Sequence, residues 1–360
     1  MSSSASPISG AALLEPLIQG RDLEAASAGS LMRAWLAGEV DPLLTAALLT
    51  ALRCKGVSGE ELAAMAAELR QACALPGERP ALPLVDTCGT GGAGVDSFNI
   101  STAVAFTAAA CGATVAKHGN RSASGRVGSA DVLEALGVDL QAPTARALAA
   151  LPAVGVTFLF APGWHPALAG LAPVRRTLGV RTVFNLLGPL VNPLRPESHV
   201  LGVARPDLLD PMAEALLRLD QGRAVVVHGH GGLDEATLSG PSELRVLENG
   251  SLRREVLDPW ALGLEPAPME AICGGGLAEN RAILEAVLQG GGTAPQRDVV
   301  ALNSALVLWV AGQAGSVPEG VALAREALAQ GLPWQRLQGL ATFLRGDGAE
   351  APQEGSGAAG

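Results

Sequence analysis

The N-terminal part of the chain has the hydrophobic spacing of packed helices. Between residues 11 and 76, apolar residues recur at intervals of three and four, as in AGSLMRAWLAG and GEELAAMAAELRQACA. Glycine and proline stand at the joints between these segments. This period is typical of amphipathic helices with breaks between them. The pattern predicts a small helical domain over residues 1–80, made of roughly four helices.

From Leu82 onward, short apolar runs that end in glycine or polar turns alternate with alanine-rich helical stretches. Strands are expected in ALPLVDTCGTGG, ATVAKHGN, VTFLFAP, SHVLGVA and RAVVVHGH. Strands that alternate with helices indicate an α/β fold with a mostly parallel sheet covered by helices. We therefore expect a large α/β domain over residues 81–163 and 196–346.

Residues 164–195 interrupt this alternation with a proline-rich helical passage. We expect this passage to pack on the small helical domain, which would then be discontinuous. After residue 275, amphipathic helices are expected to cover the sheet. Residues 347–360 have no apolar periodicity and are expected to form a disordered tail.

Composition and charge narrow the class of protein. Hydrophobic residues make up 48% of the 360 residues and charged residues 17%, as in a well-buried globular protein. The net charge of −10 disfavours nucleic acid as a partner. The five cysteines form no CxxC pair, so their spacing suggests neither a disulfide framework nor a zinc site. With no secretory or membrane-spanning pattern, we expect a cytoplasmic protein without membrane contact.

The stretch DTCGTGGAGVDSFNIST, residues 86–102, is rich in glycine and leads into a predicted helix. Glycine lets backbone N–H groups approach a ligand closely, and a helix N-terminus attracts anions. Phosphate or pyrophosphate is the natural ligand of such a loop. The stretch is neither a Walker loop nor GxGxxG, which argues against a nucleoside triphosphate or a dinucleotide.

A second polar loop, VAKHGNRSASGRVGSADVLEAL, contains Lys117, one of two lysines in the chain. Lysine offers a compact point charge, whereas arginine offers a bulkier planar fork. At a crowded strand end that faces a phosphorylated sugar, the compact charge is the better choice. His118 is interpreted as a structural hydrogen-bonding residue, with no part in proton transfer.

Two further elements carry charged side chains. Asp234 and Glu235 follow a glycine-rich turn in HGHGGLDE, and a carboxylate pair of this kind can hold Mg²⁺ together with substrate phosphates. In PVRRTLGVRTVFN, either Arg175 or Arg176 could bind a carboxylate with its fork of donors. Together, the four elements favour a magnesium-bound phosphosugar as ligand.

Four stretches in combination resemble the signatures of the anthranilate phosphoribosyltransferase family. They are DTCGTGGAGVDSFNIST, AKHGNRSASGRVGSADVLEALG, VRRTLGVRTVFNLLGPLVNP and HGHGGLDE, and the resemblance covers nearly the whole chain. It implies a homodimer of two-lobed subunits that transfers the phosphoribosyl group of phosphoribosyl pyrophosphate to anthranilate. The products would be N-(5-phosphoribosyl)anthranilate and pyrophosphate, in the second step of tryptophan biosynthesis from chorismate.

The resemblance also implies site residues. Lys117, Asp234 and Glu235 would be catalytic, and Ser101, Asp234 and Glu235 would hold Mg²⁺. Gly89, Asn120 and Arg175 would contact anthranilate. The residues around phosphoribosyl pyrophosphate would be Gly89, Gly92, Ala93, Ser97, Asn99, Ile100, Ser101, Thr102, Lys117, His118, Gly119, Asn120, Arg121, Ser122, Ala123, Ser124, Gly125 and Ser129.

One position departs from the family pattern. Similar family members carry aspartate directly after GTGG, where this chain has Ala93, whose side chain offers neither charge nor hydrogen bond. Two alternatives stay open at this point. One alternative is a related pyrimidine nucleoside phosphorylase. It would share the fold, but phosphorylases of that kind carry a KHS-like motif where this chain has KHGN. A non-catalytic relative that binds nucleic acid is the other, and the acidic charge and the Asp234–Glu235 pair count against it.

Overall fold

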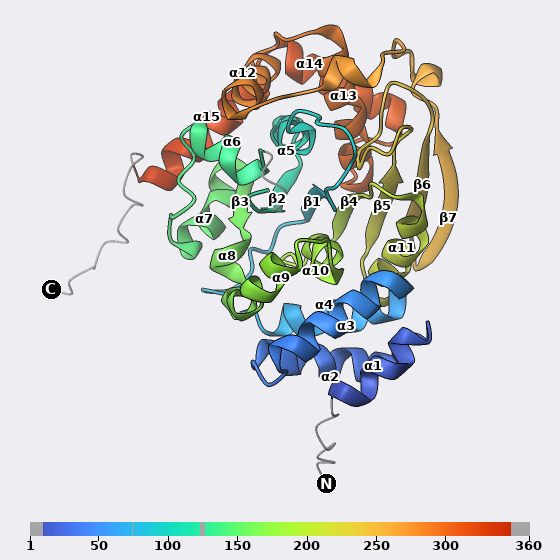
Figure 1. Ribbon diagram of the computed structural model, residues 1–360. Helices are drawn as coiled ribbons and strands as arrows, with labels where there is room; N and C mark the ends of the chain where they lie inside the picture. The colour runs from blue at the N-terminus through green and yellow to red at the C-terminus, as the bar shows by residue number, and fades with distance from the viewer. Residues whose placement is uncertain (1–9, 74, 123–126, 347–360) are drawn as a thin grey trace, which may run out of the picture.

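The computed structural model describes residues 10–73, 75–122 and 127–346 (Figure 1). Its first four helices form a bundle at one end of the molecule. Local sequence fixes where two of them begin: the Asp41 side chain accepts from Leu43 N and Leu44 N, and Ser58 and Glu61 form a capping box. The bounds are α1 Gly10–Ile18, α2 Ala25–Leu36, α3 Pro42–Lys55 and α4 Gly59–Gln71.

A single seven-stranded sheet forms the centre of the rest of the chain, in the order β3-β2-β1-β4-β5-β6-β7. The first five strands in this order are parallel, and β6 and β7 are antiparallel. The predicted α/β class with a mostly parallel sheet is confirmed. The strands are β1 Leu84–Gly89, β2 Thr114–Gly119, β3 Val156–Phe160, β4 Ser198–Gly202, β5 Arg223–His228, β6 Ser242–Glu248 and β7 Ser251–Leu257.

The sequence analysis missed β6 and β7. These strands form a hairpin around Asn249 and Gly250, which both have positive φ, as a tight two-residue turn requires. The Asn-Gly pair was the signal that could have found them. Most of β7 is exposed, and Arg253, Arg254 and Glu255 occupy its middle, so no apolar run marked it as a strand.

Helices cover both faces of the sheet. On one face, Val200 and Val225 belong to an apolar core that also includes the helices after residue 276. On the other face, Leu201 and Val226 pack in a core shared with α1 to α4. The covering helices are α5 Ile100–Ala110, α6 Ser129–Ala135, α7 Thr144–Val154, α11 Leu209–Arg218, α12 Leu277–Leu288, α13 Ala294–Val310, α14 Val317–Ala329 and α15 Leu332–Arg345.

The proline-rich passage forms short helices that touch the N-terminal bundle. Leu171, Phe184 and Leu190 lie in the same apolar core as the bundle helices. The helices of this passage are α8 Ala161–Trp164, η1 Pro166–Leu171, α9 Ala172–Leu178, α10 Val183–Leu187 and η2 Gly188–Leu190. Three further short turns are η3 Pro206–Leu208, η4 Trp260–Leu262 and η5 Met269–Ile272. Within the described ranges, the helices are all too short or too polar to cross a membrane.

The loop after β5 lies directly against the end of β4. A Cβ placed on Gly202 would lie 1.6 Å from the backbone oxygen of Asp234. Because the nearest atom belongs to the backbone, rotation of a side chain cannot relieve this contact. Glycine at position 202 is therefore what allows Asp234 to stand at the edge of the sheet.

We predict that Gly202→Ala destabilises the protein by at least about 2 kcal/mol, because the loop that carries Asp234 must move. Urea unfolding followed by circular dichroism measures this. The control is Gly163→Ala in α8, where a Cβ meets nothing within 4 Å. Equal unfolding midpoints for the two variants would contradict the close approach.

Candidate active site

Parallel strands bring their carboxyl ends to one edge of the sheet, and polar loops follow β1, β2 and β5 at this edge. A cavity of about 390 Å³ lies there, between these loops and the segment α8 to η2. We call it the sheet-edge cavity. A second cavity of about 810 Å³ adjoins it and shares Gly92, Arg175, Arg181 and Asp234 with it.

The glycine loop after β1 wraps around the carboxylate of Asp234. Gly91 N donates to Asp234 Oδ2 over 2.7 Å. Gly91 and Gly92 have φ of +68° and +86°, a region that L side chains rarely adopt. A Cβ on Gly89 would lie 2.1 Å from Asp234 Oδ2. The loop needs these glycines because its backbone, rather than its side chains, contacts the carboxylate.

Lys117 is buried at the end of β2, with 2% of its surface exposed. Its Nζ donates to Thr87 O over 2.6 Å and to Ser101 Oγ over 3.2 Å. Burial lowers the pKa of Lys117, and the nearby Asp86, Asp234 and Glu235 act in the opposite direction. An ammonium fits here because it is a single compact charge among strand ends.

Asp234 and Glu235 lie close enough to Lys117 to form one charged group. Burial raises the pKa of both carboxyl groups, and the charge of Asp234 raises that of Glu235 further. Glu235 Oε2 is buried and has no hydrogen-bond partner among the described residues. The buried carboxylate of Asp234, the partly buried carboxylate of Glu235 with its unpartnered oxygen, and the nearby Ser101 hydroxyl form the all-oxygen donor set that Mg²⁺ prefers.

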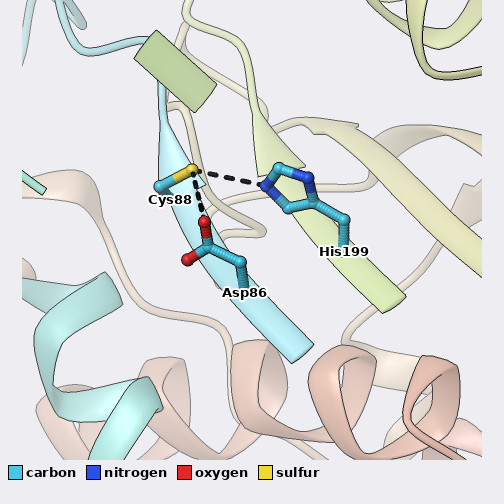
Figure 2. A group of neighbouring side chains, drawn as sticks. All are labelled: Asp86, Cys88 and His199. Atoms are coloured by element: carbon cyan, nitrogen blue, oxygen red, sulfur yellow. Dashed lines mark hydrogen bonds between the residues drawn. The ribbon is translucent and has the colours of Figure 1, made fainter. Parts of the chain in front are cut away.

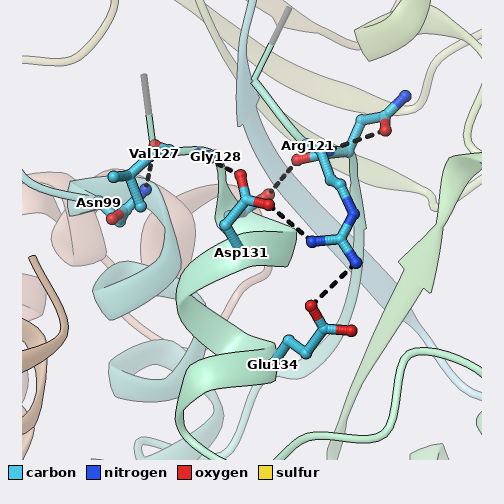
Figure 3. Close-up of polar contacts among 8 residues, drawn as sticks. Asn99, Arg121, Val127, Gly128, Asp131 and Glu134 are labelled. Atoms are coloured by element: carbon cyan, nitrogen blue, oxygen red, sulfur yellow. Dashed lines mark hydrogen bonds and ion pairs between the residues drawn. The ribbon is translucent and has the colours of Figure 1, made fainter. Parts of the chain in front are cut away.

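The loop after β2 is held against α6 by ion pairs (Figure 3). Arg121 contacts Asp131 over 2.7 Å and Glu134 over 2.9 Å, and Gly128 N donates to the other oxygen of Asp131. Asn99 donates to Val127 O from the glycine loop side. The guanidinium of Arg121 is thus engaged with α6 rather than directed freely into the cavity.

The structure gathers most of the predicted residues around the two cavities. Ala93 and Ser97 line the adjoining cavity only. Ile100 and Thr102 line neither, because both side chains are buried in the first turn of α5. Ala123, Ser124 and Gly125 lie outside the described residues. The sheet-edge cavity is lined by the predicted Gly89, Gly92, Asn99, Ser101, Lys117, His118, Gly119, Asn120, Arg121, Ser122, Ser129, Arg175, Asp234 and Glu235.

Arg175 and Arg176 differ in position. Arg175 lines both cavities and lies over the ring of Phe184 at 5.2 Å, whereas Arg176 lines only the adjoining cavity. Burial lowers the pKa of Arg175. Of these two arginines, Arg175 is therefore the one that can reach a ligand beside Lys117.

His118 is a structural residue in this geometry. Its Nδ1 lies 3.1 Å from Gly188 O. Its ring packs edge to face against the ring of His165, with the two ring centroids 5.3 Å apart. Burial lowers the pKa of His118 to about 3. The imidazole is neutral at pH 7 and is a weak base.

Arg181 is a site residue that the sequence analysis missed. It lines both cavities and donates to Thr90 O in the glycine loop. A Cβ on Gly92 would lie 2.7 Å from Arg181 Cζ, so the guanidinium lies directly on that glycine. Its charge also faces Asp234. The signal was the third arginine of VRRTLGVR, which the sequence analysis did not consider.

Comparison with known proteins agrees with this architecture. Residues 11–73 match the helical bundle domain of a glycosyl transferase family, and residues 81–333 match the α/β domain of a glycosyl transferase family. The chain is 65% identical to an anthranilate phosphoribosyltransferase of Prochlorococcus marinus (strain MIT 9313), covering 92% of this chain and 95% of the relative. A relative of the same name from Synechococcus sp. (strain WH7803) is 63% identical, and the match covers 94% of this chain and 97% of the relative.

Solved structures give the same result. The crystal structure of anthranilate phosphoribosyltransferase from Thermus thermophilus has a TM-score of 0.85 and 49% identity, covering 92% of this chain and 99% of that one. The anthranilate phosphoribosyltransferase from Saccharomyces cerevisiae in complex with PRPP and Mg has a TM-score of 0.84 and 26% identity. The match covers 95% of this chain and 99% of the yeast chain.

The fold and the cleft thus define a two-lobed glycosyl transferase. More narrowly, the chain belongs to the anthranilate phosphoribosyltransferase family. It is an enzyme that transfers a phosphoribosyl group to anthranilate. This result sets aside both alternatives of the sequence analysis, the nucleoside phosphorylase and the non-catalytic nucleic-acid binder.

We predict that Arg181→Met lowers kcat/KM about 10- to 100-fold, because the glycine loop loses the side chain that fixes it. Steady-state kinetics measure the loss, and circular dichroism checks the fold. The control is Arg176→Met, which should stay within about twofold of the unsubstituted chain because Arg176 does not line the sheet-edge cavity. If both variants lose activity equally, Arg181 has no special role in holding the loop.

Proposed function

We propose that Lys117, Asp234 and Glu235 catalyse the transfer of the phosphoribosyl group from phosphoribosyl pyrophosphate to anthranilate. The observation that carries this proposal is that a buried ammonium, the buried carboxyl group of Asp234 and the partly buried carboxyl group of Glu235 line one cavity at the edge of the sheet. Buried charges of this kind are costly for folding and are typical of functional sites.

In the proposed mechanism, the amine of anthranilate attacks C1 of the ribose while pyrophosphate departs. The bond from C1 to the pyrophosphate oxygen breaks with its electron pair on that oxygen, so negative charge grows on the leaving group. Lys117 stabilises this charge from a fixed, water-poor position. Ser101, Asp234 and Glu235 would hold Mg²⁺, which would supply further positive charge to the pyrophosphate.

The remaining groups position the substrates. Arg175 would hold the carboxylate of anthranilate, and Asn120 and Gly89, which line the same cavity, would contact this substrate too. Arg181 keeps the glycine loop in place through its hydrogen bond to Thr90 O. No strong base is required, because an aromatic amine attacks in its neutral form and loses its proton afterwards. This agrees with the low pKa of His118, about 3, which leaves it neutral but weakly basic.

The proposed function also implies where the protein is located, how many subunits it has and which partners it lacks. We propose a cytoplasmic homodimer that contacts neither nucleic acid nor membrane. The net charge of −10 supports the absence of a nucleic-acid partner.

We predict that the purified chain consumes anthranilate, seen as a loss of its fluorescence, when phosphoribosyl pyrophosphate and Mg²⁺ are both present. Lys117→Met should lower kcat by roughly 10²- to 10³-fold, because methionine fills the space without the charge. Circular dichroism checks that the variant folds. Near-normal turnover of a folded Lys117→Met variant would remove Lys117 from the mechanism.

We further predict that metal affinity rises with pH. Both carboxyl groups have raised pKa values, so protons compete with the cation at low pH and leave as pH increases. In this experiment Mn²⁺ is used in place of Mg²⁺. Water-proton relaxation measures the affinity of the protein for Mn²⁺ between about pH 5 and about pH 8. Glu235→Gln should weaken binding and flatten its pH dependence. Binding that is independent of pH in the unsubstituted chain would contradict the assignment.

A further inference from the structure

Three side chains with metal-binding atoms meet below the sheet-edge cavity, on the face of the sheet that looks toward the N-terminal helices. Asp86 and Cys88 are two residues apart on β1, so they point to the same face, and Asp86 is paired in register with His199 on β4. Cys88 Sγ lies 3.4 Å from His199 Nε2 and 4.0 Å from Asp86 Oδ2 (Figure 2).

These separations are close to what a tetrahedral zinc site needs. All three ligand atoms lie within 4.8 Å of one another. With Zn–S about 2.3 Å and Zn–N about 2.0 Å, sulfur and nitrogen bound to one ion stand about 3.5 Å apart. The separation between the sulfur of Cys88 and the oxygen of Asp86 has to shorten by about half an ångström. Sulfur, imidazole and carboxylate together suit Zn²⁺ or Cd²⁺ and do not suit Mg²⁺.

Hydrogen bonds already fix the orientation of the carboxylate. Asp86 Oδ1 accepts from Thr87 N over 2.7 Å and from His118 N over 3.2 Å. Asp86 Oδ2 accepts from Asn192 Nδ2 over 2.8 Å, and that amide also donates to Ala116 O. A carboxylate oxygen has two lone pairs, so Oδ2 can hold Asn192 and a metal ion together. Such outer contacts orient ligands in known metal sites.

A metal ion can reach the cluster through the sheet-edge cavity, and two side chains can offset its charge. Cys88 lines the sheet-edge cavity, whereas Asp86 and His199 lie beneath it at 0% and 1% exposure. On binding, the Cys88 thiol releases its proton to solvent, and the thiolate and Asp86 offset both charges of the ion. Because Asp86 already carries a negative charge before binding, the cluster changes from a net charge of −1 to zero. One positive charge is therefore added near Arg70 and Lys117, two cations whose fields reach His199.

The position of this cluster connects it to the catalytic lysine. Asp86 and Cys88 stand on either side of Thr87, whose carbonyl accepts a hydrogen bond from the Lys117 ammonium. Asp86 is also one of the anionic neighbours of Lys117. A metal ion that engages Asp86 would take this countercharge away from Lys117.

We propose that Asp86, Cys88 and His199 form a second, inhibitory metal site that takes a thiophilic divalent cation such as Zn²⁺. The binding of the ion is independent of the function proposed above, whereas its inhibitory effect rests on the proposed role of Lys117. Sequence spacing alone gave no sign of it, because Cys88 and His199 are 111 residues apart.

The test uses Cd²⁺, whose bond to thiolate gives a charge-transfer absorbance in the ultraviolet. In the full chain with Cys54, Cys73, Cys111 and Cys273 replaced by serine, the absorbance should saturate at one equivalent. His199→Gln in this background should lower the affinity at least about 10-fold, as loss of a ligand does. The matched control retains Cys111 instead of Cys88. The Cys111 thiol lies 3.6 Å from Leu323 O and belongs to no cluster of three metal-binding side chains in the described chain.

The proposal is overturned if the chain that retains Cys88 binds Cd²⁺ no better than the chain that retains Cys111, or if His199→Gln changes nothing. If the multiple substitution prevents folding, the same comparison is made between the unsubstituted chain and Cys88→Ser. The single variant should then lose one equivalent of tightly bound Cd²⁺. An equal number of bound ions in both would refute the site.

A separate measurement tests inhibition. Zn²⁺ is titrated with Mg²⁺ in excess, and each variant is compared with its own activity without Zn²⁺. Cys88→Ser should require at least about 10 times more Zn²⁺ for half inhibition. If Cd²⁺ binds at Cys88 but Cys88→Ser does not raise the Zn²⁺ concentration for half inhibition, the link to Lys117 is overturned. If the unsubstituted chain is completely inactive and still binds Cd²⁺ at Cys88, the result counts against the proposed function alone.

Discussion

The burial of one ammonium group at the end of β2 is the constraint on which the arrangement of this site depends. Lys117 is 2% exposed, so little water can solvate its charge and neighbouring groups must balance it. The Thr87 carbonyl accepts a hydrogen bond from it, and carboxyl groups from β1 and from the loop after β5 surround it. These partners come from different strands, so the parallel pairing of the sheet is what allows the lysine to be buried.

The same constraint explains the glycines around the cavity. The carboxylate of Asp234 is held by the backbone of the glycine loop, and its own backbone lies against the end of β4. Side chains at Gly89 or Gly202 would occupy the space of these groups. Arg181 then covers the loop from the outside. Backbone contacts cost little side-chain entropy, so the loop can be rigid before any substrate arrives.

A sheet edge crowded with buried polar groups also brings together residues with other chemistry. Asp86 lies under Lys117 as part of its charge balance, and the cysteine and histidine beside it complete a set of metal ligands. The predicted competition between a soft metal ion and the lysine therefore follows from close packing of charges, with no separate binding pocket. Mg²⁺ prefers oxygen ligands, and its proposed ligands are Asp234 and Glu235 instead.

Hydrophobic period and turn residues determined the helices of the first 71 residues, the five parallel strands and the position of each polar loop, because these depend on neighbours along the chain. The charged hairpin of β6 and β7 escaped this reasoning, since its exposed strand carries no apolar run. Residue spacing left Arg175 and Arg176 open and only the family resemblance favoured Arg175, which the structure places in the lining of the sheet-edge cavity. Tertiary structure alone decided that Arg181 covers Gly92 and that Cys88 meets His199. Each of these contacts joins elements far apart in sequence, and only the register and packing of the sheet bring them together.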